Sequence, residues 1–146
     1  MYSCPCCSFK TLSEQEVWEI CPVCGWEDDP VQLKDPTYMG GANKESLNQV
    51  KETWSQKGIA VSVLNGDEGG LGNIYKRLSE DLKFPSYFGN NLDALDECLA
   101  QDVKTAYIVW INSKQAKTSL GETFDKLVSV INSAAKENPE LKFILR

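Results

Sequence analysis

The chain has 146 residues, 42% hydrophobic and 25% charged, with 15 basic against 21 acidic residues and a net charge of −6. This composition excludes a disordered tail and argues against binding to nucleic-acid phosphates, which needs lysine and arginine to displace counterions. The charge would suit a basic protein as partner, but moderately acidic proteins are common and most of them bind nothing basic. No apolar stretch approaches membrane-spanning length and no signal-peptide pattern opens the chain, so we expect a cytoplasmic protein that spans no membrane.

Five of the six cysteines lie within the first 24 residues, in two similar clusters. Cys4-Pro-Cys-Cys7 and Cys21-Pro-Val-Cys24 share the pattern Cys-Pro-x-Cys followed by a small residue. Each such turn points two thiolates at one ion, and four thiolates are the tetrahedral set that Zn²⁺ prefers. We therefore predict one structural zinc ion held by Cys4, Cys7, Cys21 and Cys24. Four protein ligands leave no open position for catalysis.

The remaining N-terminal thiol, Cys6, aligns with Val23 of the second cluster and is therefore not expected to bind the metal. Its role stays open. Six cysteines could also form three disulfides, but these need an oxidising compartment, and a thiol redox protein using Cys6 is a further alternative.

Beyond the cysteine clusters the predicted elements alternate between helix and strand. They are a short amphipathic helix at 46–57, a strand at 59–64, a helix at 71–83, a helix from 91 to about 101, a strand at 106–111, a long helix at 119–137 and a strand at 141–145. Strands that alternate with helices pair in parallel through right-handed crossovers. The pattern predicts two domains: a small zinc-ribbon or knuckle module at 1–57, and a small α/β domain at 58–146.

The helix that begins after Asn91 is acidic on one face. From Phe84 to Val103 there is no lysine or arginine, while Asp93, Asp96 and Glu97 lie within about one turn of each other. With Asn91 as N-cap, Asp93 in the first turn is stabilised by the helix dipole, which needs no functional explanation. Glu97, four residues later on the same face, repels Asp93, so a cationic partner is the alternative explanation.

Two aromatic residues and a glycine, Tyr87, Phe88 and Gly89, precede this helix. The aromatics are either exposed anchors for a partner or residues of the core. The chain has no histidine, which removes the commonest general base. Without a histidine to activate it, Cys98 is expected to be a buried packing residue rather than a nucleophile. We predict that the protein is not an enzyme.

The segment from Pro85 to Leu99, with its Tyr-Phe-Gly-Asn-Asn-Leu-Asp-Ala-Leu core, resembles the barstar family of barnase inhibitors, and the similarity extends weakly over 58–146. The resemblance implies a three-stranded parallel sheet with packed helices, and inhibition of a nuclease by a helix and loop inserted into its basic active site. It places the following residues at partner-facing positions: Tyr87, Gly89, Asn91, Asp93 and Glu97. Phe88 and Asp96 complete the predicted partner-binding set.

This chain departs from the family pattern at three positions. Glu97 replaces an aspartate, Asp96 replaces a tryptophan, and Ser133 falls near a position where the family has a further acidic contact. The charge at position 97 is kept, with a longer reach. These differences leave the identity of the partner open.

The N-terminal segment resembles the cysteine-rich CPCC domain, a small zinc-binding module, over about 1–54. The resemblance is carried by the two cysteine clusters, by Trp26-Glu-Asp-Asp-Pro30 and by Gly40-Gly-Ala-Asn43.

The combined interpretation is an immunity protein that forms a 1:1 complex with a basic toxin nuclease. The resemblance to barstar-like domains implies that this nuclease is a ribonuclease. The alternative is a zinc-ribbon adaptor or regulator that acts through protein contacts. The N-terminal module has five lysines against nine acidic residues, which argues against direct binding to nucleic acid.

Overall fold

The computed structural model describes residues 1–146, which form two compact units, Met1–Gly58 and Ile59–Arg146. That residues 1–57 and 58–146 fold as independent domains stays a prediction. No helix has both the length and the apolar character needed to cross a membrane.

The first unit contains little regular structure. Strands β1 (Tyr2–Ser3) and β2 (Lys10–Leu12) pair antiparallel, and two helices follow, α1 (Pro30–Lys34) and α2 (Leu47–Gln56). Helix α1, which the sequence did not predict, begins where the Asp29 carboxylate accepts from the Val31 N–H. Helix α2 begins with a capping box, in which Ser46 and Gln49 each accept the other's backbone N–H.

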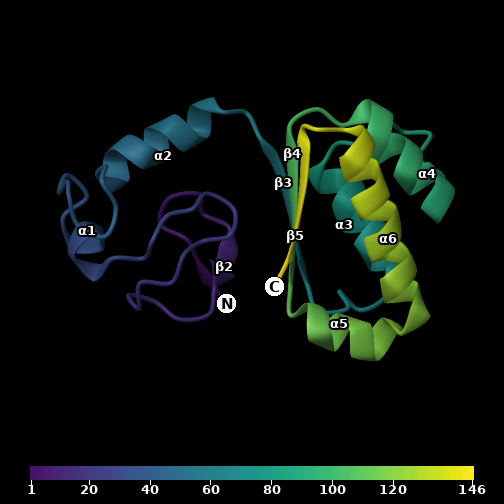
Figure 1. The fold of residues 1–146 in the computed structure, drawn as a ribbon, viewed down its shortest axis with the longest axis horizontal. Coiled ribbons are helices and arrows are strands. Elements are labelled where there is room, and N and C mark those ends of the chain that lie inside the picture. The colour runs from purple at the N-terminus through teal and green to yellow at the C-terminus, as the bar shows by residue number, and fades with distance from the viewer. The chain divides into compact units, whose positions relative to one another are not determined.

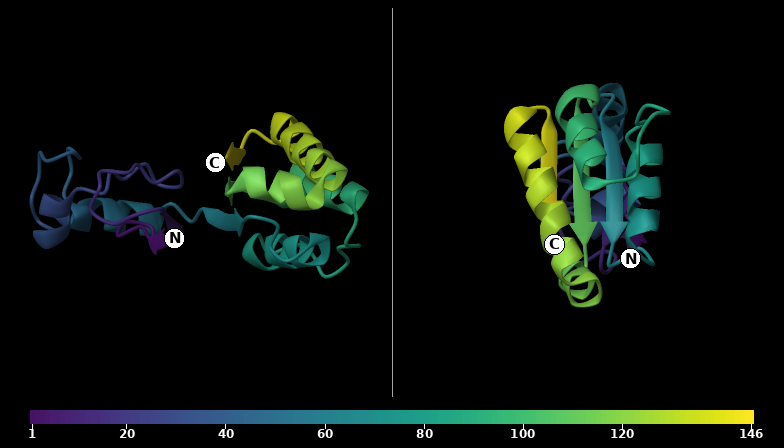
Figure 2. Two further views of the ribbon diagram at one scale, coloured as in Figure 1. Left: turned by 90° about the horizontal axis from the view of Figure 1, so that it is seen from below. Right: turned by 90° about the vertical axis from the view of Figure 1, so that its right-hand side faces the viewer.

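The second unit is an α/β domain with a three-stranded parallel sheet, as the sequence and the family resemblance predicted. Its strands are β3 (Ala60–Asn65), β4 (Ala106–Ile111) and β5 (Leu141–Leu145), in the order β3-β4-β5. Val63 pairs with Val109, and Val109 pairs with Ile144. Helices α3 (Leu71–Asp81), α4 (Leu92–Glu97), α5 (Ser113–Leu120) and α6 (Glu122–Glu137) lie on one side of this sheet (Figures 1 and 2).

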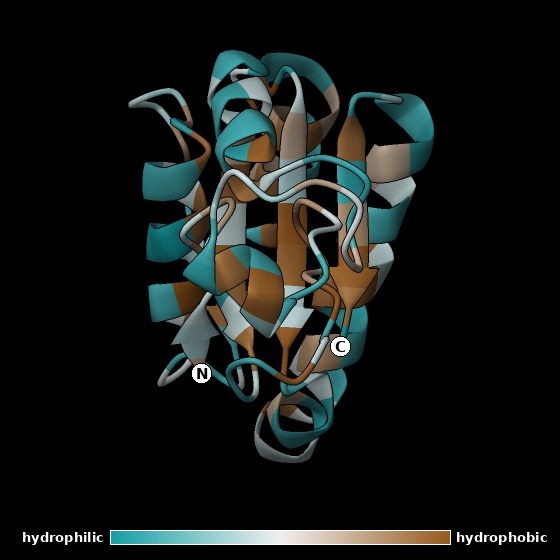
Figure 3. Cartoon of the chain, turned by 90° about the vertical axis from the view of Figure 1, so that its left-hand side faces the viewer, coloured by the Kyte–Doolittle hydropathy of each residue, from teal (hydrophilic) through white to brown (hydrophobic).

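The core of the second unit lies between the sheet and these helices. Leu78 of α3, Leu99 after α4 and Leu127 of α6 are completely buried in one apolar cluster. Trp110 of β4 packs edge-on against Phe124 and donates its indole N–H to the Gly66 carbonyl at 2.7 Å. Figure 3 shows the resulting contrast, with mostly hydrophobic strands in the sheet and mostly polar loops in the first unit.

Two predicted helices need correction. The long helix expected at 119–137 begins three residues later, as α6 at Glu122, and residues 113–120 form a separate helix, α5, which the sequence did not predict. Gly121 separates the two helices, because its φ of 59° is one that helical residues do not adopt. The helix expected from 91 to about 101 is α-helical only to Glu97. It then continues as a π-helical turn, η1 (Cys98–Asp102), in which the Val103 N–H donates to the Cys98 carbonyl.

A buried asparagine stabilises the π-helical turn. The Asn138 side-chain amide donates at 2.9 Å both to the Leu99 carbonyl and to the Val103 carbonyl. These carbonyls end the helix inside the protein, where an unpaired acceptor is costly. Asn138 therefore ties the end of the acidic helix to the end of α6.

Candidate functional site

The four cysteines predicted as metal ligands come together in the first unit. Their sulfur atoms all lie within 4.8 Å of one another. The Cys4 and Cys24 sulfurs are 3.6 Å apart, and the Cys7 and Cys21 sulfurs are 3.7 Å apart. A zinc–sulfur bond of about 2.3 Å in a tetrahedron places its sulfurs about 3.8 Å apart. The four thiols therefore fit a tetrahedral metal ion, and their chemistry is consistent with zinc.

The two cysteine turns have the same backbone hydrogen bonds. In the first, the Cys4 N–H donates to the Phe9 carbonyl and the Ser8 N–H donates to the Cys4 carbonyl. In the second, the Cys21 N–H donates to the Trp26 carbonyl and the Gly25 N–H donates to the Cys21 carbonyl. The small residue after each turn has a positive φ, 68° at Ser8 and 79° at Gly25. The left-handed residue turns the backbone after each pair of cysteines, so that both thiols of the pair point toward the same place.

Hydrogen bonds to sulfur show how the cluster is charged. The other three thiols, Cys24 foremost, donate to the Cys21 sulfur and hold the pKa of Cys21 far below its usual range. The Thr11 hydroxyl, 3.0 Å from the same sulfur, adds to this effect. Donation to Cys21 raises the pKa of the other three, that of Cys24 to about 12. Four thiolates packed this closely would repel one another, so a cation among them is needed for all four to ionise.

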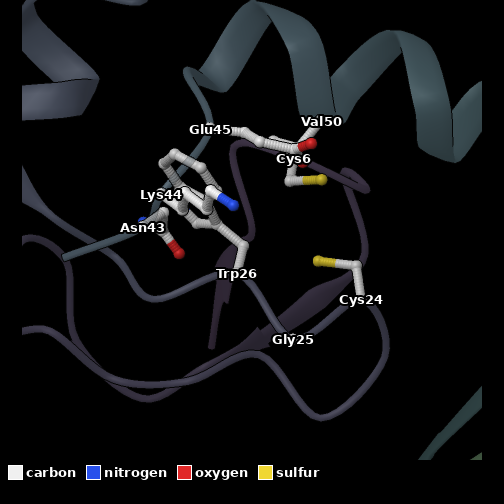
Figure 4. A pocket seen from close by; sticks show the side chains of 8 residues that line it. All are labelled: Cys6, Cys24, Gly25, Trp26, Asn43, Lys44, Glu45 and Val50. Carbon is white, nitrogen blue, oxygen red and sulfur yellow. The ribbon is translucent and has the colours of Figure 1, made fainter. Parts of the chain in front are cut away.

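A cavity of about 280 Å³ opens beside the four thiols, and its wall includes Cys6, Cys24 and Trp26 (Figure 4). The sulfur of Cys6 lies outside the group of four. Figure 4 shows the thiols of Cys6 and Cys24 pointing into the same space. The Trp26 side chain is buried, yet its indole N–H has no hydrogen-bond partner.

Polar side chains hold the rest of the first unit together, and sequence reasoning did not predict their role. Gln32, completely buried, donates to the carbonyls of Tyr38, Asn43 and Glu45 and accepts from the Asn43 N–H at 3.0 Å. The Asn43 side chain forms two further bonds with the backbone of Glu27, at 2.7 and 2.9 Å.

Asp29 joins the same network from the start of α1. Its carboxylate accepts from the Ala42 N–H at 2.8 Å as well as from Val31, and the bond from Ala42 is the main cause of its lowered pKa. A Cβ at Gly41 would collide with the Asp29 carboxylate and with Gln32, which explains the glycine there. The Gly40-Gly-Ala-Asn43 motif thus links its own segment to Asp29 and to Glu27, three residues after the second metal-binding turn.

The acidic helix α4 is positioned as the sequence predicted. The Asn91 side chain caps it by accepting the Ala94 N–H at 2.8 Å. Gly89 lies close to Asn91 and Ala94, and a Cβ there would be 3.1 Å from the Asn91 amide. Asp93 and Glu97 are exposed, and neither takes part in an ion pair; the chain's two ion pairs are Arg77–Glu68 and Lys117–Asp125.

The remaining predicted partner-facing residues differ in their surroundings. The Tyr87 side chain is 71% exposed, and its hydroxyl donates to the Asp102 carboxylate at 3.2 Å. Phe88 is half-buried and packs edge-on against Tyr75 and Phe84, so it supports the loop from inside. Asp96 is half-buried, and one of its carboxylate oxygens is buried without a hydrogen-bond donor.

Cys98 lies beneath the acidic residues as a buried thiol. Its side chain is 2% exposed. Burial, followed by the negative charge of Asp102, raises the pKa of Cys98 to about 11. At neutral pH it is therefore an uncharged thiol, which fits a packing residue rather than a nucleophile.

Comparison with known proteins links these features to families. Residues 70–146, just over half of the chain, match the family described as Barstar (barnase inhibitor). The chain belongs to the barstar family. Residues 2–65 match the family described as Cysteine-rich CPCC, a match that runs through β3 into the second unit. Both resemblances predicted from the sequence motifs are thereby confirmed.

A curated relative of this barstar-family protein is known from Bacillus subtilis (strain 168), where it is named "Putative ribonuclease inhibitor YrdF". It is 36% identical over 74 residues, which cover 49% of this chain and 81% of the relative.

Proposed function

We propose that this protein binds and inhibits a nuclease by placing helix α4 and the loop before it into a basic active site. The observation that carries the proposal is the pair of exposed carboxylates, Asp93 and Glu97, on a helix face with no basic residue to neutralise them. Membership of the barstar family and the relative named as a ribonuclease inhibitor support a nuclease as the partner.

The proposed mechanism is electrostatic and steric. A nuclease holds substrate phosphate with arginine, lysine or histidine, and carboxylates can accept hydrogen bonds from the same groups. Asn91 and Gly89 fix the direction of the helix, and the exposed ring of Tyr87 offers an aromatic anchor beside it. The protein would block the site without chemistry of its own, as a cytoplasmic immunity protein in a 1:1 complex with a toxin.

The metal site has a separate role in this proposal. One zinc ion bound by Cys4, Cys7, Cys21 and Cys24 would be structural, because four thiolates occupy every tetrahedral position. The ion supplies the positive charge that lets the four sulfurs ionise together, and the protein's own residues orient them: the Thr11 hydroxyl donates to the Cys21 sulfur, and the Cys7 N–H donates to the Cys4 sulfur.

The test is a binding and inhibition assay with two nuclease probes, the ribonuclease barnase and, where the gene's neighbourhood encodes one, a nuclease from that neighbourhood. The double variant Asp93→Ala, Glu97→Ala should lose several kcal/mol of affinity, because truncating a buried charge pair at an interface costs about 2–5 kcal/mol. Association should also slow as salt rises. Inhibition of neither nuclease by the unmodified protein would contradict the proposal.

The matched control is Glu122→Ala, Glu137→Ala, which removes the same charge from exposed positions on α6 that form no ion pair. This control should retain nearly full affinity. Equal losses in the two double variants would mean that only net charge matters and that α4 is not the binding helix.

A further inference from the structure

The cavity beside the metal-binding thiols brings together a ligand and a non-ligand cysteine. Cys6 and Cys24 both line the cavity of about 280 Å³ and a second cavity of about 160 Å³. In both cavities Glu45 and Val50 form part of the same wall. Their two sulfurs point into this shared space (Figure 4). A small molecule that enters either cavity therefore meets both thiols together.

Cys24 differs from the other three members of the thiol cluster in its accessibility. Cys4 and Cys21 are 1% exposed and Cys7 is 8% exposed, whereas Cys24 is half-buried. The cavity thus reaches the cluster through one specific ligand.

Cys6 is not needed to complete the cluster. Its counterpart in the second turn, Val23, is buried and apolar, so the turn forms equally well without a thiol at this position. A fifth thiol that is spare for metal binding, yet faces the accessible ligand, is placed to react with it.

We propose that Cys6 and Cys24 are a peroxide-sensitive pair, whose oxidation to a disulfide takes one ligand away from the metal site. Cys24, which would be a thiolate as a metal ligand, attacks hydrogen peroxide, so that an S–O bond forms, the O–O bond breaks and hydroxide leaves. The Cys6 sulfur then attacks the Cys24 sulfenic acid; the S–S bond forms, the S–O bond breaks, and the departing hydroxide takes the Cys6 proton to become water. The two sulfurs give up two electrons, which reduce the peroxide.

The consequence is a loss of metal binding that a reductant reverses. Three thiolates remain after the disulfide forms, and the tetrahedral set is incomplete. Because binding energy of the metal is folding energy in so small a module, oxidation would loosen residues 1–58 while leaving the barstar domain folded. This inference concerns the N-terminal unit and does not depend on the proposed nuclease partner.

The experiment treats the full zinc-loaded protein with hydrogen peroxide and follows zinc release with a chromogenic chelator. Disulfides are mapped in parallel by tandem mass spectrometry, in protein with and without metal, because residues 1–10 carry three cysteines that only fragmentation distinguishes. The variant Cys6→Val copies the residue of the second turn, and Cys98→Ala removes the other non-ligand thiol.

Expected results are a Cys6–Cys24 disulfide in the unmodified protein, reversal by dithiothreitol, and zinc release several-fold slower in Cys6→Val than in Cys98→Ala. A disulfide between two ligands, such as Cys4–Cys24, would overturn the proposal, and so would equal release rates in the two variants. Failure of Cys6→Val to bind zinc would also overturn it, because Cys6 would then be a ligand.

Discussion

Of the seven buried polar or charged side chains in the chain, five lie in residues 1–58, the unit with fewer internal contacts and little regular structure. In the second unit the buried side chains are almost all apolar and form one cluster between sheet and helices. A core of that kind is stabilised by the apolar area that it removes from water, without a requirement for particular hydrogen bonds. The first unit depends on thiols and amides, which work only in specific geometry.

The comparison shows two ways for a short chain to fold. The N-terminal unit has too few apolar residues for a core of its own. Many of its backbone groups lie outside helices and strands, and they form hydrogen bonds instead with the side chains of Gln32, Asp29 and Asn43. We therefore expect its stability to depend on the metal site, and that of the barstar domain not to.

The largest expected effect comes from removing one metal ligand. Cys21→Ser should abolish stoichiometric zinc binding and unfold residues 1–58, since apparent zinc-binding energies in small modules are about 10–16 kcal/mol. Hydrogen exchange measured segment by segment should show lost protection there and native protection in residues 59–146. Cys98→Ala is the control and should keep both. Persistent protection of residues 1–58 without metal would show that the polar network suffices.

The opposite result is expected from a cavity in the apolar core. Leu78→Ala, at a completely buried position of α3, should lower the free energy of unfolding of the second unit by about 2–5 kcal/mol. Urea unfolding followed by near-ultraviolet circular dichroism measures this loss, and zinc content should stay unchanged. If zinc affinity falls in parallel, the two units are one cooperative structure and the contrast between them breaks down.

A third change tests the polar network directly. Gln32→Leu keeps the approximate shape of the side chain but leaves buried backbone carbonyls without a donor, at a cost of at least about 1–3 kcal/mol. Zinc affinity measured by chelator competition should fall accordingly. The exposed Gln56→Leu is the matched control. Equal affinities in the two variants would show that water satisfies the same groups.

Features encoded by local sequence could be predicted. Strands at 106–111 and 141–145 have the bounds expected from their β-branched and aromatic residues. The Asn91 cap depends on residues only three positions apart, and the four-thiol cluster follows from spacing within two short turns.

Features that depend on distant residues could not be predicted. The π-helical turn after Glu97 is stabilised by Asn138, which belongs to the end of another helix. Helix α5 is too polar to show a periodic apolar face in the sequence. Gly121 can be recognised as the break between α5 and α6 only from its positive φ, which the sequence does not reveal. Nothing in the sequence distinguishes buried Gln32 from a surface glutamine, since its partners are backbone carbonyls.

The smallest expected effect distinguishes the two cysteine turns. Both have a left-handed residue after the second cysteine, but only Gly25 adopts this conformation without steric cost, whereas Ser8 does so with a side chain. A Cβ at Gly25 would meet nothing within 4 Å, so Gly25→Ala isolates the backbone cost, about 1–2 kcal/mol. Chelator competition should show zinc affinity falling by about five- to thirtyfold in Gly25→Ala and rising in Ser8→Gly. The exchanged variant Ser8→Gly, Gly25→Ser should be close to the unmodified protein if the turns are energetically equivalent. A large loss in the exchanged variant would mean that the second turn, whose Cys21 accepts the Thr11 hydroxyl, contributes more to holding the metal than the first.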